Sequence, residues 1–116
     1  MKLPKTFKGL IEQANQLDLY QKLIEQLNKD FKLANLDLEF HEDVLPASLK
    51  VLLHETLYIL IQEKFTEYLN LLYIIDVPEN QVKSLNGDAI LKLSEEVSFL
   101  ILLREWQKVW FKNKYA

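Results

Sequence analysis

The first third of the chain carries hydrophobic residues at alternating spacings of three and four, a pattern that predicts amphipathic helix. A step of three after Leu17 lies beside Asp18, a possible N-cap. It fits either a phase slip in one helix or a break between two. We expect a break near Asp18 and a second helix that ends near Asn35. The hydrophobic positions are Leu3, Phe7, Leu10, Ala14 and Leu17, followed by Tyr20, Ile24, Leu27, Phe31 and Ala34.

The next segment alternates between hydrophobic and acidic residues from Leu36 to Phe40, as a short strand does. No second strand is indicated elsewhere in the sequence, so we expect an extended connection. Pro46 suits the first turn of a helix, and the acidic residues Glu42 and Asp43 before it complement the helix dipole.

A long central helix is predicted over about 47–75, because this stretch contains neither Gly nor Pro. A thinner apolar line of Leu52, Ile59 and Tyr73 falls within its polar side, which indicates contacts on two sides of the helix. The predicted core face consists of Leu49, Leu53, Leu57, Leu60, Ile61, Phe65, Tyr68, Leu72 and Ile75.

The last third of the chain predicts a short helix over 78–85, a turn over 86–88 and a long helix over about 89–112. Within the last helix, residues 97–103 are apolar on every side except at Ser98, so this part must be surrounded by partners. Together the elements predict an all-α fold. We expect a small bundle of four to five helices, formed by residues 1–116 as a single domain, with the C-terminal helix in its core.

The composition of the chain is that of one globular domain, with 116 residues of which 49% are hydrophobic and 27% charged. The absence of cysteine excludes a disulfide framework and a thiol nucleophile. The N-terminal residues lack the apolar core of a signal peptide, and no apolar run approaches the roughly 20 residues needed to cross a bilayer. We therefore expect a cytoplasmic protein without a transmembrane segment.

The charges are unevenly distributed along the chain. Residues 1–34 and 80–116 each carry a balance of +2, whereas residues 35–79 carry −7, and the total is −3. This distribution would favour packing of the two basic ends beside the acidic middle, although solvated faces with chance asymmetry explain it equally well. The net charge gives no general reason to expect nucleic acid or an anionic membrane as a partner.

Catalytic and metal-binding patterns are incomplete. His54 and Glu55 begin like the helix of a zinc protease, but Tyr58 stands where the second histidine is needed. His41 is the other histidine, and no Glu-x-x-His pair of a di-iron bundle occurs. The serines lack a glycine-flanked elbow, and the two glycines are too far apart for a phosphate loop. We expect no catalytic activity, no metal and no cofactor.

Two charges interrupt hydrophobic faces: Lys64 in the central helix and Arg104 in the last helix. If either is enclosed it requires an acidic partner, because an unpaired buried charge costs several kcal/mol. For Arg104 we expect a partner from the acidic middle of the chain. The functional alternative is a cation that anchors a small ligand in the centre of the bundle.

The end of the last helix interleaves bases with aromatic rings. Trp106 and Trp110 are four residues apart, on one helix face. Such an ending suits a helix that lies on a membrane surface, or a stacking platform for single-stranded nucleic acid. We prefer a core or an interface, where tryptophans at helical spacing are usually found. A separate strip of bases consists of Arg104, Lys108 and Lys112.

The sequence therefore predicts a non-catalytic interaction protein that self-associates, for example as a homodimer, or binds a partner helix. One alternative is a peripheral membrane or nucleic-acid binder that acts through the C-terminal helix, including Lys114. Another is a bundle that binds a small ligand in its centre. The candidate interface residues are Leu52, Ile59, Tyr73, Trp106, Trp110 and Phe111.

Overall fold

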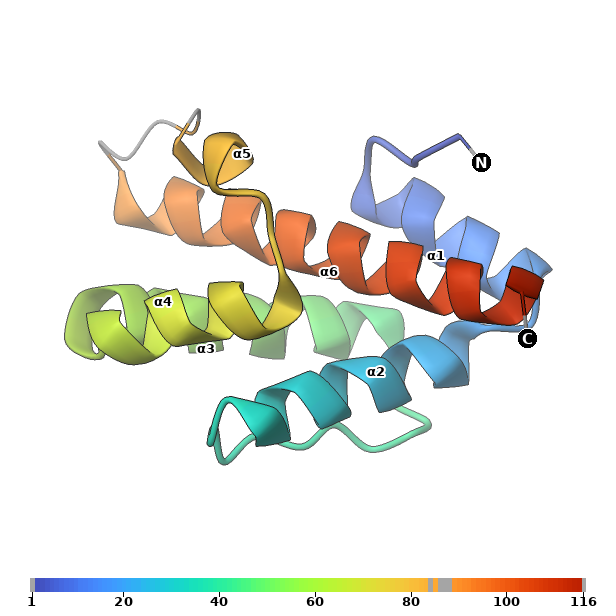
Figure 1. The fold of residues 1–116 in the computed structure, drawn as a ribbon, viewed down its shortest axis with the longest axis horizontal. Coiled ribbons are helices and arrows are strands. Elements are labelled where there is room, and N and C mark those ends of the chain that lie inside the picture. Colours follow the sequence, from blue (N-terminus) through green and yellow to red (C-terminus); the bar gives the residue numbers. More distant parts are fainter. Residues whose placement is uncertain (1, 84, 86–88, 116) are drawn as a thin grey trace.

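The computed structural model describes residues 2–83, 85 and 89–115. This part of the chain is all-α, as predicted, with no strand (Figure 1). It contains six helices, one more than the upper limit of the predicted four to five. It measures 36 × 28 × 25 Å along its principal axes. The helices are α1 (Phe7–Gln16), α2 (Tyr20–Leu33), α3 (Pro46–Glu63), α4 (Phe65–Ile75), α5 (Glu79–Lys83) and α6 (Ile90–Tyr115).

Helix α6 runs through the middle of the bundle and contacts α1, α2, α3 and α4 (Figure 1). Its apolar middle explains this position, because a helix that is hydrophobic all round needs neighbours on every side. Val97 and Ile101 are fully buried, and Leu102 is almost so. The predicted core role of residues 97–103 is confirmed for the four that are buried, whereas Phe99, Leu100 and Leu103 are partly buried and pack against the core. The helix extends three residues beyond the predicted end.

The predicted long central helix is wrong, because the chain reverses direction at Lys64 between α3 and α4 (Figure 1). Lys64 leaves helical geometry, with φ −139° and ψ 58°. Folding back places the buried residues of both helices in one core. The break also exposes Phe65, which the pattern assigned to the core face.

The first, second and fourth helices each end with a residue in the left-handed conformation. Asp18, Asn35 and Asp76 have φ values of 56°, 59° and 67°. In each case the next residue donates its N–H to a carbonyl five residues earlier, as from Leu19 to Ala14 at 2.8 Å. This is the Schellman arrangement, usually built with glycine. The predicted break near Asp18 is confirmed, but Asp18 ends α1 and does not cap α2, whose N-cap is Leu19.

The connection between α2 and α3 is extended, as predicted, and is fixed to α2 by a side chain. Asn28 accepts a hydrogen bond from the Phe40 N–H at 2.8 Å and donates one to the Phe40 carbonyl at 2.8 Å. The Tyr20 hydroxyl donates to the Val44 carbonyl at 2.6 Å. Pro46 occupies the first turn of α3, as predicted.

Between α4 and α6 the predicted helix over 78–85 is shorter, since α5 covers Glu79–Lys83. The predicted turn over 86–88 lies outside the described residues. Within the described ranges, no helix has the length and apolar character to cross a membrane.

Candidate functional site

Helix α4 presents three large hydrophobic side chains to solvent, spaced by four residues. Phe65, Leu69 and Tyr73 are 54%, 50% and 82% exposed, respectively. Residues four apart lie above one another on a helix, so the three form a continuous stripe, here called the α4 face. The opposite side of α4 is buried through Tyr68, Leu71 and Leu72, among others.

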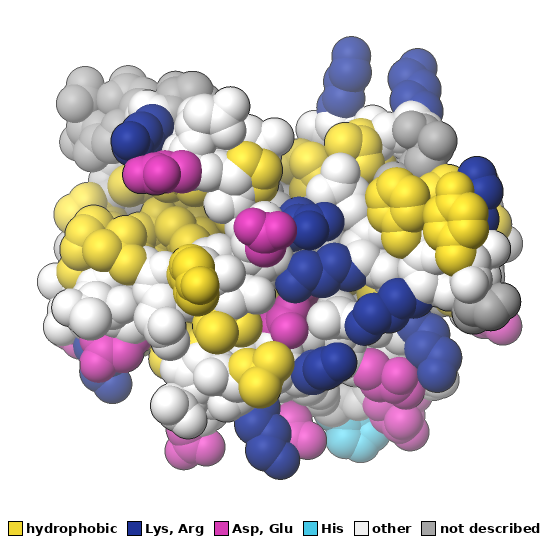
Figure 2. Space-filling model, in the orientation of Figure 1, with side chains coloured by type: hydrophobic (Ala, Val, Ile, Leu, Met, Phe, Trp, Pro, Cys, Tyr) yellow, Lys and Arg dark blue, Asp and Glu magenta, His cyan; other side chains and the backbone are white. Residues whose placement is uncertain are grey.

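A groove of about 460 Å³ lies between the α4 face and α5. Hydrophobic side chains gather over α4 and below α5 in the left half of Figure 2. Charged groups at the rim of the groove are paired. The Lys83 ammonium lies 3.1 Å from the Glu79 carboxylate, and the Arg104 guanidinium lies 3.2 Å from the Asp76 carboxylate. The α4–α5 groove is lined by Leu69, Leu72, Tyr73, Asp76, Val77, Pro78, Glu79, Val82 and Lys83.

A second unusual feature is a buried polar cluster between α2 and α6. The Lys108 ammonium lies 2.9 Å from the Asp30 carboxylate and 3.3 Å from Oε1 of Glu105. Asp30 also accepts a hydrogen bond from the Gln26 amide at 3.2 Å. Glu105 is fully buried, and neither of its carboxyl oxygens accepts a hydrogen bond from the described residues.

The environment shifts the pKa values of the two carboxyl groups of this cluster in opposite directions. Burial, reinforced by the adjacent Asp30, raises the pKa of Glu105 from 4.5 to about 9. Burial alone would also raise the pKa of Asp30, but the neighbouring Glu105, Lys108 and Gln26 side chains outweigh it and lower that pKa. At neutral pH Glu105 is therefore a neutral acid, and Asp30 is the carboxylate that pairs with Lys108.

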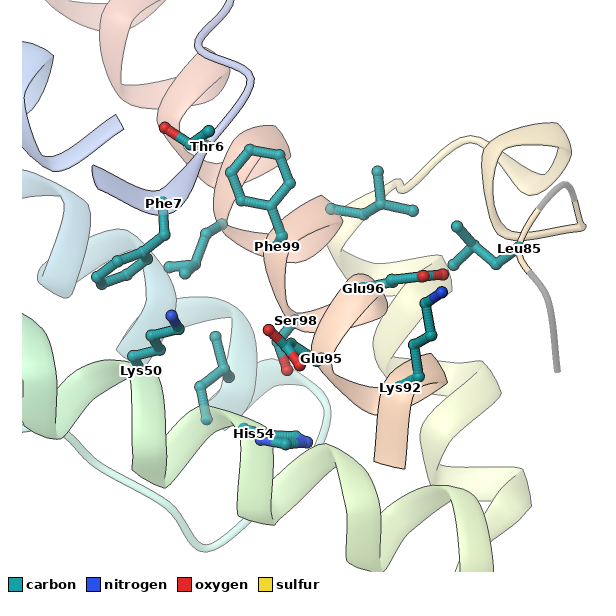
Figure 3. A pocket seen from close by; sticks show the side chains of 13 residues that line it. Thr6, Phe7, Lys50, His54, Leu85, Lys92, Glu95, Glu96, Ser98 and Phe99 are labelled. Carbon is teal, nitrogen blue, oxygen red and sulfur yellow. The ribbon is translucent and has the colours of Figure 1, made fainter. Parts of the chain in front are cut away.

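A pocket of about 430 Å³ lies between α1, α3 and α6 (Figure 3). The rings of Phe7 and Phe99 form part of its wall, and the Lys50 ammonium lies 5.5 Å from the centre of the Phe7 ring. The His54 ring donates a hydrogen bond to the Leu91 carbonyl at 3.1 Å. The pocket lies at the side of the bundle, whereas the centre of the bundle is filled by the core.

The structure separates the residues predicted to form one interface. Trp106 is fully buried and its indole N–H donates to Gln13 at 3.0 Å, so its assignment to the interface is wrong. Trp110 is partly buried. Phe111 is 49% exposed and packs edge-on against the Trp110 ring, with the centroids 5.2 Å apart.

The predicted apolar line of Leu52, Ile59 and Tyr73 is also divided. Leu52 and Ile59 are 42% and 48% exposed on α3, but Tyr73 belongs to α4, beyond the reversal at Lys64. The line therefore does not continue along one helix. Tyr73 instead joins the two other exposed residues of the α4 face.

The two candidate buried charges have different surroundings. Lys64 is exposed at the reversal between α3 and α4, which excludes it as an enclosed cation. The Arg104 side chain is 28% exposed; it pairs with Asp76 and donates to the Asp76 carbonyl at 3.0 Å. Asp76 belongs to the acidic middle segment from which the partner was expected. Neither cation lies in the centre of the bundle.

The basic strip on α6 is engaged within the chain. Arg104 and Lys108 hold carboxylates, and the Lys112 ammonium donates to Gln26 at 2.6 Å. Because Trp106 also lies in the core, several of the residues that were predicted to contact a membrane or a nucleic acid are engaged within the chain. Lys114 remains near the rings, 4.8 Å from the centre of Trp110.

The two histidines lie in different parts of the fold and make different contacts. His41 accepts a hydrogen bond from the Asp43 N–H at 3.1 Å in the α2–α3 connection, while the His54 ring bonds to Leu91. Among the residues that the structure describes, no three His, Asp or Glu side chains are grouped so as to hold a metal ion.

Sequence reasoning missed both Glu105 and the α4 face. Glu105 is four residues from both Ile101 and Val109, which are buried, so its helical spacing was a signal of burial. The four-residue spacing of Phe65, Leu69 and Tyr73 was also present. It was obscured because a continuous helix would have placed Phe65 on the core face.

Comparison with known proteins gave no matching family model, no matching curated protein and no matching solved structure.

Proposed function

We propose that this protein is a non-catalytic helical interaction module that forms a homodimer through the α4 face and the α4–α5 groove. The observation that carries the proposal is the exposure of Phe65, Leu69 and Tyr73 beside an apolar groove. Exposed apolar surface of this kind is stabilised when a partner removes it from water.

The α4 face has the two properties that a twofold-symmetric interface requires. It carries projecting side chains, of which Tyr73 is the most exposed, and it lies directly beside a groove. In a homodimer with twofold symmetry the same patch meets itself, so the projecting groups of one copy can enter the groove of the other.

The charges at the rim of the groove also favour a second copy of the chain. Asp76 is neutralised by Arg104, and Glu79 by Lys83. Two identical rims with no surplus charge can approach each other without like-charge repulsion. A strongly charged partner gains no comparable electrostatic attraction here.

Sedimentation equilibrium of the whole chain tests the proposal. We expect a concentration-dependent dimer, and we expect Leu69→Glu to make the protein monomeric, because two carboxylates would then be desolvated at the interface. The circular dichroism spectrum of this variant should be unchanged, since the Leu69 side chain is half exposed in one chain.

Leu17→Glu is the matched control. Leu17 is 48% exposed, nearly the same as Leu69, but lies between α1 and α2, at the opposite end of the molecule from the α3–α4 reversal (Figure 1). The dimer dissociation constant of the Leu17→Glu variant should equal that of the unmodified chain. A chain that is monomeric at all concentrations, or a dimer that survives Leu69→Glu, would contradict the proposal.

A second candidate function is the binding of a small aromatic molecule in the α1–α3–α6 pocket. The supporting observation is the combination of the Phe7 and Phe99 rings with the Lys50 ammonium, in a volume typical of ligand pockets. Lys92, Glu95 and Glu96 also line the pocket, so its lining carries no excess of positive charge. Anilinonaphthalene sulfonate is a suitable fluorescent probe. Its binding should weaken in Lys50→Gln and remain in Leu69→Glu; the reverse result would assign the probe to the α4 face.

A further inference from the structure

A groove of about 400 Å³ runs between α2 and α6, separate from the α4 face. Lys and Arg side chains gather over these two helices in the centre and lower right of Figure 2. The floor of the groove includes two buried hydrophobic residues, Leu19 and Val109. The α2–α6 groove is lined by Leu19, Lys22, Glu25, Gln26, Lys29, Val109, Lys112 and Asn113.

The lining of this groove is positively charged although the whole chain carries −3. Three ammonium groups face one carboxylate, that of Glu25, which lies 3.5 Å from Lys22. Lys29 and Lys112 have no carboxylate within ion-pair distance among the described residues. The groove therefore holds two cations that the chain itself does not neutralise.

The Lys112 ammonium is held in place by a chain of hydrogen bonds from the interior. It donates to the Gln26 side chain at 2.6 Å, and the Gln26 amide donates in turn to the Asp30 carboxylate at 3.2 Å. Gln26 and Asp30 are only 7% and 4% exposed. A cation positioned in this way loses less side-chain entropy when it binds an anion.

We propose that the α2–α6 groove binds a small organic molecule that bears phosphate groups. The phosphate oxygens accept hydrogen bonds from the ammonium groups of Lys29 and Lys112, and the apolar part of the ligand covers Leu19 and Val109. The volume of the groove lies in the range of small-molecule sites, and Lys is a common phosphate ligand. Gln26 acts as a positioning residue through Lys112.

Isothermal titration calorimetry of the whole chain with ADP tests the proposal, with adenosine and pyrophosphate as probes of the two parts of the ligand. We expect saturable binding of ADP that weakens at high salt, and weaker binding of both adenosine and pyrophosphate. Lys29→Gln and Lys112→Gln should each weaken ADP binding by about fivefold or more.

Lys32→Gln is the matched control, because it removes one positive charge from α2 outside the groove and should leave ADP binding unchanged. Gln26→Leu should weaken ADP binding while Lys112 remains in the chain. A circular dichroism spectrum identical to that of the unmodified chain shows that each variant is folded.

Three results would overturn the proposal. They are the absence of ADP binding at millimolar concentration, equal binding of ADP and adenosine, and ADP binding that persists in a variant carrying both Lys29→Gln and Lys112→Gln. A single-stranded oligonucleotide that binds when ADP does not would assign the cations to nucleic acid. Because Leu69→Glu lies outside this groove, ADP binding in that variant separates this proposal from the dimer.

Discussion

The buried polar cluster between α2 and α6 and the exposed α4 face reverse the usual distribution of side chains. In the first region Asp30 and Glu105 are buried and the Lys108 side chain is 18% exposed, whereas in the second Phe65, Leu69 and Tyr73 are exposed. Within the cluster the Asp30 carboxylate is paired with the Lys108 ammonium, whereas the two Glu105 oxygens have no hydrogen-bond partner among the described residues. The α4 face has no comparable partner among the described residues, so its hydrophobic groups remain in water. A buried charge can therefore be paired within one chain, whereas the exposed hydrophobic stripe is the surface through which we propose a second copy binds.

Removing the cation of the buried cluster should strongly destabilise the fold. Lys108→Met should lower the free energy of unfolding by about 3–5 kcal/mol, because the Asp30 carboxylate then remains buried without its ion-pair partner. Urea denaturation followed by tryptophan fluorescence measures the change. Lys114→Met, at an exposed position of the same helix, is the control and should have little effect. A loss below about 1 kcal/mol in Lys108→Met would show that the cluster is well hydrated.

The protonation of Glu105 predicts an unusual dependence of stability on pH. Because the pKa of Glu105 is raised from 4.5 to about 9, the folded protein keeps a proton that the unfolded chain releases in this window. The free energy of unfolding should therefore fall as the pH rises from 4.5 to 9, by up to about 1.4 kcal/mol per pH unit. Asp30, with its lowered pKa, contributes stability that is lost as the pH falls through that pKa.

Glu105→Gln removes the titrating carboxyl group and replaces it with an amide of similar size beside Asp30. Its unfolding free energy should be nearly independent of pH across the window in which that of the unmodified chain declines. Urea denaturation at a series of pH values measures both curves. Parallel curves for the two proteins would assign the pH dependence to other groups.

Substitution of two leucines on α4 allows the buried and the exposed side of one helix to be compared directly. Leu71 is fully buried and Leu69 is 50% exposed. Leu71→Ala should cost about 2–5 kcal/mol in the free energy of unfolding, through lost burial and the remaining cavity. Leu69→Ala should change it by less than about 0.5 kcal/mol in the monomer at low concentration. If Leu69→Ala costs as much as Leu71→Ala in the monomer, the α4 face is packed within one chain.

A substitution at a helix end away from both regions should change the stability only slightly. Asp18→Gly should raise the free energy of unfolding by up to about 1 kcal/mol, because glycine adopts a φ of 56° without strain. Asp76→Gly relieves the same strain but removes the carboxylate that pairs with Arg104, so its gain should be smaller. Thermal unfolding measures both. Equal gains would indicate that the exposed ion pair contributes nothing to stability.

The sequence predicted most of the helices because their hydrophobic periods and terminators are local signals. The break near Asp18, the start at Pro46 and the core position of residues 97–103 are examples. The reversal at Lys64 has no local signal, since neither Gly nor Pro stands there. It depends on how α3 and α4 pack against each other and against α6, a property of the assembled fold.

The candidate sites were harder to predict for the same reason. The spacing of Trp106 and Trp110 shows that both lie on one helix face, but it does not show what that face packs against. The structure places Trp106 in the core. Arg104 and Asp76 are 28 residues apart, and Lys108 and Asp30 are 78 apart. A sequence shows that such charges need partners, whereas the pairing itself depends on how the helices pack.

The central position of α6 has a consequence for biosynthesis. Helices α1 to α4 all pack against α6, yet the ribosome synthesises α6 after every one of them. Leu23, Leu53 and Leu71, which are fully buried in the finished fold, emerge before the helix that completes their core. The nascent chain therefore carries exposed apolar surface until α6 has left the ribosome, and during this interval it is open to aggregation and to chaperone binding.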